Sequence, residues 1–301
     1  MIGWDDRERA ALYALLEMST QFSLTKQDLS TRISENSLPS EILLQNCPSE
    51  LFGDPADEAM ELAAKRIALL ESQGIQVLTP GDTKYPRRLA GVFDRPLLLF
   101  ARGTVQPRDD SVAVVGSRHC TAAGEKMTAA IARGLVDMGI TVAAGLAEGI
   151  DTAAHQEALR AQGQTVAVIG TGINKFYPAK NRSLQLEIAE RGTVFSQFWP
   201  DAPPQKHTFL ERNGTMSGYS LATVIVEASE YSGTRVQARK AIRHGRPVIL
   251  STKVAEATLW GREALTNSDV HVADSADAAL RIVQDIRNRP LLSTEIFAGH
   301  S

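Results

Sequence analysis

Hydrophobic positions follow two different periods along the chain. Apolar residues recur near helical spacing over residues 7–72, whereas short β-branched runs alternate with helical stretches over residues 109–288. The segment between them contains several prolines and one apolar run, 97–100, which predicts a short strand. The sequence is therefore predicted to comprise a helical N-terminal domain (1–73), a connector (74–108), an α/β domain (109–290) and a tail (291–301).

The predicted α/β domain contains short runs of consecutive apolar residues. Such runs are typical of strands in a parallel sheet that helices cover on both faces. Strands are predicted at 112–115, 141–144, 166–169, 194–196, 223–226, 248–250 and 270–272. Helices are predicted at 122–138, 151–161, 181–190, 209–219, 234–244 and 275–286. This alternation predicts an α/β fold with a doubly wound, mainly parallel sheet.

Composition and charge narrow the class of protein. Hydrophobic residues make up 43% and charged residues 22%, which is ordinary for a globular protein. The net charge is −3, so no bulk field attracts nucleic acid, and any polyanion site is expected to be a local basic patch. Cys47 and Cys120 lie too far apart in sequence for a CxxC metal or redox site. No apolar run reaches the ~18 residues of a membrane span, and the N-terminus is acidic where a signal peptide would be basic. A reduced, cytoplasmic protein is therefore expected.

Small residues follow four of the predicted strands. Ligands of open α/β sheets bind beyond the carboxyl ends of the strands, where backbone N–H groups and helix N-termini suit phosphate. One such turn is explained by backbone geometry alone, but four together, with Arg118 beside the first, favour a phosphate-bearing ligand. The small residues predicted to bind are Gly116, Ser117, Gly149, Gly170, Gly172, Ser232 and Gly233.

Several sharper motifs are absent from the sequence. There is no phosphate-binding loop of the GxxxxGK[ST] type, no nucleophile elbow and no HExxH. Lys175 stands where the dinucleotide fingerprint of Gly170 and Gly172 needs its third glycine. His155 is expected to pack or hydrogen-bond, and Asp151 to cap its helix. We therefore expect no cofactor, no metal and no catalysis.

Basic residues gather late in the chain. Residues 231–253 contain six of them, including Arg239, and no acidic residue. Lys206 and Arg212 flank Phe209, so an aromatic ring lies among cations, as single-strand binding requires. The alternative interpretation is that these basic residues lie on a solvated helix face and that Phe209 packs in the core.

At these motifs the sequence resembles the DNA-processing protein A (DprA/Smf) family. The resemblance covers residues 74–252 in order and spacing. The matching motifs are VAVVGSR (112–118), GLAEGID (145–151), Tyr177-Pro178 with Asn181, FLERN (209–213) and VEASEYSGT (226–234).

The resemblance implies an extended Rossmann-like fold and a cytosolic protein. It implies binding of single-stranded DNA, loading of a RecA-type recombinase, and a homodimer, which we expect to form through residues 221–290. It implies that Arg118 contacts DNA phosphate and that Phe209, Arg212 and Asn213 lie in the same neighbourhood.

Two positions depart from the family pattern, and one rival interpretation stays open. Glu148 and Gly214 stand where the family usually has arginine, which should weaken phosphate binding. The rival is a nucleotide-sensing Rossmannoid with a cleft like that of phosphoribohydrolases. Gln237 replaces the glutamate of the hydrolase motif and cannot act as a general base, so catalysis is not expected.

Overall fold

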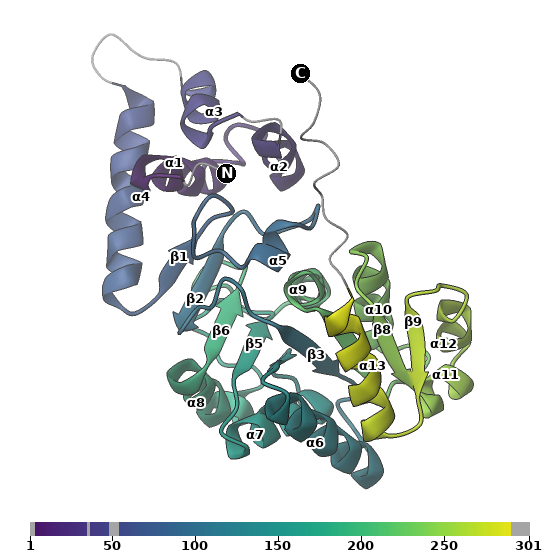
Figure 1. Cartoon of the computed structure of the whole chain (residues 1–301). Coiled ribbons are helices and arrows are strands. Elements are labelled where there is room, and N and C mark those ends of the chain that lie inside the picture. Colours follow the sequence, from purple (N-terminus) through teal and green to yellow (C-terminus); the bar gives the residue numbers. More distant parts are fainter. Residues whose placement is uncertain (1–3, 35–36, 48–53, 290–301) are drawn as a thin grey trace.

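The computed structural model describes residues 4–34, 37–47 and 54–289. Its N-terminal part is a cluster of helices, shown in purple and blue in Figure 1: α1 (Asp6–Glu17), α2 (Lys26–Ser34), α3 (Pro39–Asn46) and α4 (Pro55–Ser72). Their apolar faces meet in a core that includes Leu12, Leu15 and Ile42. Glu8 ties α1 to α3, because its carboxylate accepts hydrogen bonds from the Ser40 backbone N–H (2.9 Å) and hydroxyl (2.6 Å).

A nine-stranded sheet follows, in the order β1-β2-β6-β5-β4-β3-β7-β8-β9. From β6 to β9 in that order, each strand is parallel to its neighbour. The strand β2 is antiparallel to both of its neighbours, β1 and β6. The chain runs outward from β3 to β6 and then returns to place β7 on the other side of β3, so the order reverses between β3 and β7. The strands are β1 (Gln76–Leu78), β2 (Leu99–Gly103), β3 (Ser111–Val115), β4 (Thr141–Ala144), β5 (Thr165–Ile169), β6 (Thr193–Ser196), β7 (Ala222–Ile225), β8 (Val248–Ser251) and β9 (Val270–Ala273).

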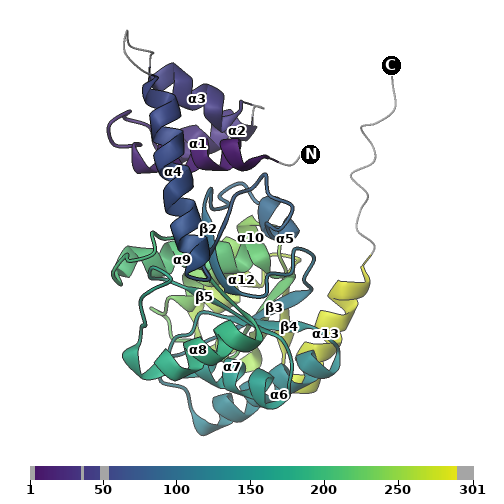
Figure 2. The same cartoon turned by 90° about the vertical axis from the view of Figure 1, so that its left-hand side faces the viewer.

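Helices cover both faces of this sheet (Figures 1 and 2). On one face, α6 (Ala122–Asp137), α7 (Ile150–Arg160) and α13 (Ala276–Asn288) pack on Val112, Val114 and their neighbours. On the other, α9 (Lys206–Tyr219) and α10 (Thr234–Arg243) pack on Ala113, Val115 and Ile225. The remaining elements are α5 (Arg87–Ala90), a 3₁₀ turn (Ala179–Asn181), α8 (Arg182–Arg191), α11 (Thr252–Ala257) and α12 (Leu259–Ala264).

The predicted α/β fold, an extended Rossmann-like sheet with N-terminal helices, is confirmed. Each of the seven strands predicted for the α/β domain agrees with an observed strand to within one residue at either end. The segment predicted as a connector holds β1 and β2, so it belongs to the same sheet. The division into domains stays a prediction, and the predicted tail lies outside the described residues.

The connector is also joined to α10. Asp94 lies 2.5 Å from the Lys240 Nζ and 2.6 Å from the His244 Nε2. The His244 Nδ1 in turn lies 2.8 Å from the Ser217 hydroxyl of α9. One carboxylate therefore links the connector to the two helices that cover this face of the sheet.

Candidate functional site

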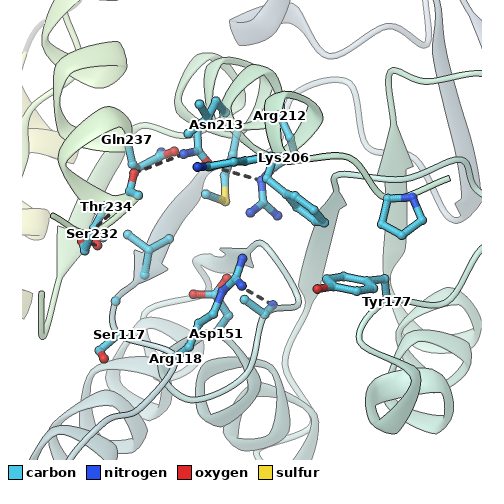
Figure 3. Close-up of a pocket in the computed structure, with 18 of the residues that line it drawn as sticks. Ser117, Arg118, Asp151, Tyr177, Lys206, Arg212, Asn213, Ser232, Thr234 and Gln237 are labelled. Atoms are coloured by element: carbon cyan, nitrogen blue, oxygen red, sulfur yellow. Dashed lines mark hydrogen bonds between the residues drawn. The ribbon is translucent and has the colours of Figure 1, made fainter. Parts of the chain in front are cut away.

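A pocket of about 590 Å³ opens at the carboxyl ends of β3 and β7. This is where the strand order reverses, the place at which open α/β sheets bind their ligands. Loops after both strands and one side of α9 form its walls (Figure 3). Of the predicted site residues, it brings together Gly116, Ser117, Arg118, Lys206, Phe209, Arg212, Asn213, Ser232 and Gly233.

The loop after β3 can approach α7 closely only because it contains glycine. A Cβ on Gly116 would lie 2.6 Å from Ile150 Cγ1 and 2.9 Å from the Glu227 carbonyl oxygen. Gly149 has φ +75°, and a Cβ there would lie 2.3 Å from the Ser117 carbonyl oxygen. The lack of a Cβ at both positions lets the Ser117-Arg118 turn lie against the start of α7, where the Ile150 N–H donates to the Ser117 carbonyl oxygen (3.2 Å). Gly149 thus supports the turn from below rather than lining the pocket.

Phe209 lies half-buried on α9, which begins three residues earlier than predicted, at Lys206. The Arg118 guanidinium carbon is 5.9 Å from the centre of the Phe209 ring, within reach of a cation–π contact. The Tyr177 ring lies 5.3 Å from the same ring. A Cβ on Gly170 would lie 2.4 Å from Phe209 Cδ1, so Gly170 provides the space beneath the ring. The aromatic and the cation thus share one wall of the site.

Arg212 lies beneath that wall and is 7% exposed. Its Nη1 donates hydrogen bonds of 2.6 Å to both the Gly145 and Val168 carbonyl oxygens, at the ends of β4 and β5. Burial lowers the pKa of Arg212, while the charge of Asp151 acts in the opposite direction. Arg212 therefore holds two strand ends together. The phosphate contact expected of it stays a prediction.

Asp151 was predicted to cap its own helix, and this prediction is wrong. Gly149 is the residue that precedes α7, and the Asp151 carboxylate instead accepts from the backbone N–H groups of Gly145 (3.0 Å) and Ala147 (3.4 Å). Burial raises the pKa of Asp151, against the charge of Arg212. The carboxylate turns inward because these loop N–H groups and the Arg212 cation lie there.

His155 is a buried hydrogen-bonding residue, as predicted. Its Nδ1 lies 2.7 Å from the Thr165 hydroxyl. Burial lowers the pKa of His155 to about 3, so the ring is neutral at pH 7. This histidine supports the sheet and does not face the pocket.

Three predicted site residues lie elsewhere. The Gly172 N–H donates to the Ala202 carbonyl oxygen (2.9 Å), so it is engaged and not available to a phosphate. The Lys175 Nζ lies 3.5 Å from Asp201. Arg239 is exposed on α10 and is not among the residues that line the described pocket. The glycine pattern was misleading here, since Gly172 is needed for close backbone packing against Trp199 and Pro200.

The two departures from the family pattern have different surroundings. The Glu148 carboxylate lies 2.7 Å from the Lys180 Nζ, and Glu148 lines a smaller neighbouring cavity that shares Arg118, Tyr177 and Phe209 with the pocket. The hydrogen bond from Lys180 lowers the pKa of Glu148, and the charges of His119 and Arg118 act in the same direction. At Gly214, a Cβ would lie 3.5 Å from both Asp94 Oδ2 and the Lys240 Nζ. Glu148 is thus the departure that changes the field of the pocket.

Tyr177 and Gln237 are among the lining residues that were not predicted as site residues. Tyr177 belongs to one of the quoted motifs, and its aromatic type was the available signal. Gln237 was noted only as a lost general base, yet it lines the pocket. Within the described residues, no cluster of three or more potential ligands could hold a metal ion, and no helix is long and apolar enough to cross a membrane.

The fold and the pocket define an extended Rossmann-like protein whose cleft combines cations with an aromatic wall. The family model described as DNA recombination-mediator protein A matches residues 76–284. The chain therefore belongs to that family. The family's description names a recombination mediator of DNA processing rather than an enzyme.

Known relatives and solved structures agree with this assignment. The chain is 39% identical over 168 residues to DNA processing protein DprA of Streptococcus pneumoniae, covering 56% of this chain and 59% of that protein. It is 37% identical over 178 residues to protein Smf of Synechocystis, covering 58% and 45%. The match thus spans less than two thirds of either relative.

The S. pneumoniae DprA crystal structure superposes with a TM-score of 0.70 at 28% identity, covering 93% of this chain and 98% of that chain. DNA processing protein A from Helicobacter pylori, a structure described for its single-stranded DNA binding mode, shares the fold at 23% identity. Its TM-score is 0.62, and the match covers 70% of this chain and 96% of that chain.

Proposed function

We propose that this protein binds single-stranded DNA in the pocket between β3 and β7, without covalent chemistry, and delivers it to a RecA-type recombinase. The observation that carries the proposal is the pairing of Arg118 with the Phe209 ring in one pocket. A cation that tracks the phosphate backbone and a ring on which a base stacks are the two parts of a single-strand site. Lys206, exposed at the rim, adds a second cation.

Arg118→Ala is expected to weaken binding of a thymine oligonucleotide about tenfold and to reduce the salt slope of log K by about 0.7 for each phosphate that is no longer neutralised. The protein should keep its melting temperature, because Arg118 lies at the surface of the pocket. Fluorescence anisotropy across a salt series measures both quantities. Arg133→Ala is the matched control, since Arg133 is exposed on α6 away from the pocket. Equal salt slopes for both variants would remove Arg118 from the site.

Glu148→Gln is expected to do the opposite and raise affinity several-fold. The substitution removes a negative charge from the field of Arg118 and releases Lys180 from its ion pair, so that a further phosphate can be neutralised. The same salt series should show a steeper slope. Glu187→Gln is the control, because it breaks a similar exposed pair with Arg191 outside the pocket. Unchanged or weaker binding by the Glu148 variant contradicts this assignment.

Recombinase loading and dimerisation belong to the same proposal. The family description supports the first, and the delivery step can be measured as faster recombinase assembly on DNA covered by a single-strand-binding protein. We propose a homodimer through residues 221–290, where the edge strand β9 carries Val272, 41% exposed. A monomer mass by light scattering at micromolar concentration would contradict it. We place the protein in the cytoplasm.

Nucleotide sensing remains the alternative because the pocket's volume suits a single nucleotide. The two functions differ in their competitors. If a mononucleotide displaces the oligonucleotide when both are present at the same concentration of nucleotides, nucleotide sensing is favoured. If only strands several nucleotides long compete, single-strand binding is favoured.

A further inference from the structure

One side chain in the wall of the pocket has unused hydrogen-bonding capacity. Gln237, on α10, is 1% exposed. Neither its Oε1 nor its Nε2 has a hydrogen-bond partner among the described residues. A buried amide without partners destabilises a protein, and most buried polar groups are satisfied. Such a group next to a ligand pocket is explained if the ligand completes it.

The neighbouring amide behaves differently. The Asn213 Nδ2 donates to the Gly233 carbonyl oxygen (3.4 Å), and its Oδ1 accepts from the Arg212 Nε (3.2 Å). Asn213 is therefore fixed by the protein itself, whereas Gln237 is not. Figure 3 shows Gln237 on the side of the pocket formed by Ser232 and Thr234, with Tyr177 on the opposite side.

The chemistry of an amide excludes phosphate as its best partner. A phosphate offers only acceptor oxygens, whereas an amide carries a donor next to an acceptor. Each of the four nucleobases carries a donor next to an acceptor on its Watson–Crick edge, and unpaired bases are read there. Val115 and Met216, which also line the pocket, offer apolar surface to a flat ring.

We propose that the Gln237 amide binds the Watson–Crick edge of an unpaired base. The inference rests on the proposed function and adds the group that recognises the base, while Arg118 takes the phosphate. The terminal torsion of glutamine is broad, so the amide can turn toward an entering base at small energetic cost. Because that edge is occupied in a duplex, Gln237 makes the site select single strands over paired DNA.

The test uses the full chain and two oligonucleotides, one of thymine and one of N3-methylthymine. The methyl group blocks the donor of the Watson–Crick edge and leaves the ring able to stack. The unaltered protein should bind the methylated strand about tenfold more weakly, as removal of a bidentate hydrogen-bonded pair predicts. Gln237→Met should bind thymine about tenfold more weakly and should not distinguish the two strands. Equal binding of both strands by the unaltered protein overturns the proposal.

Stability measurements separate this role from a structural one. Gln237→Met removes an unsatisfied amide, so it should melt at or above the temperature of the unaltered protein. Thr223→Val is the matched control, because the Thr223 hydroxyl on β7 is also buried and unpartnered but does not line the pocket. It should bind both strands as the unaltered protein does; weaker binding overturns the local assignment.

If the unaltered protein binds neither strand, the proposed function is contradicted. If it binds both strands equally and tightly, the role of Gln237 alone is contradicted.

Discussion

Replacing Arg212 by methionine is expected to lower the free energy of unfolding by about 3–5 kcal/mol, the range for removing one member of a buried charge pair. The substitution takes away the donor shared by the Gly145 and Val168 carbonyl oxygens. It also leaves the buried Asp151 carboxylate without its neighbouring cation. Since a chain of this size loses about 2–4 °C of melting temperature per kcal/mol, the loss should be about 10 °C.

Two further variants identify the cause of that loss. Lys206→Met changes an exposed cation on the same helix and should stay within about 0.5 kcal/mol of the unaltered protein. Asp151→Asn in the Arg212→Met background should cost less than it does alone, because the carboxylate has already lost its cation. An Arg212→Met protein that melts normally would show that Arg212 does not hold the strand ends. Additive losses would show that Arg212 and Asp151 do not stabilise each other.

The parts of the fold that the sequence predicts well depend on local patterns. The apolar runs of β3 to β8 are buried on both faces, and this leaves a signal that an amphipathic helix does not share. The short elements α11 and α12 were missed because six residues show too little of a helical period. Their starts are set by the Ser251 and Thr258 hydroxyl oxygens, which accept hydrogen bonds from the Val254 and Gly261 backbone N–H groups. Serine and threonine are also common in loops, so they do not mark a helix start by themselves.

In the candidate site, too, local sequence patterns predict some features, whereas others depend on tertiary contacts. That glycines would follow the strands was visible in the sequence, but which of them faces a ligand depends on tertiary contacts. Gly116 stands in the pocket, whereas Gly172 packs against the Trp199 and Pro200 carbonyl groups. Likewise Arg212 resembles a surface cation in the pattern of its helix, and only burial assigns it to the strand ends. Gln237 stood out only once its lack of partners was visible.

The second large effect is expected at Asp94, which joins the connector to α10. Asp94→Asn should lower the free energy of unfolding at pH 7 by about 3 kcal/mol, because it leaves Lys240 and the buried His244 without their carboxylate. Urea unfolding measures the loss. Asp57→Asn is the control, since the Asp57 carboxylate forms an exposed ion pair with Arg7 and its loss should change stability by less than about 1 kcal/mol.

The loss at Asp94 should depend on pH in one direction. Burial alone would raise the pKa of Asp94, but hydrogen bonds and charges from His244 and Lys240 outweigh it and hold that pKa well below its ordinary value. A carboxylate with a depressed pKa in the folded state stabilises the protein above its unfolded pKa of about 4, and this contribution falls as the pH drops below that value. The gap in stability between the unaltered protein and Asp94→Asn should therefore narrow between about pH 5 and pH 3. A gap that stays constant over that range would show that the carboxylate's charge does not hold the connector to α10.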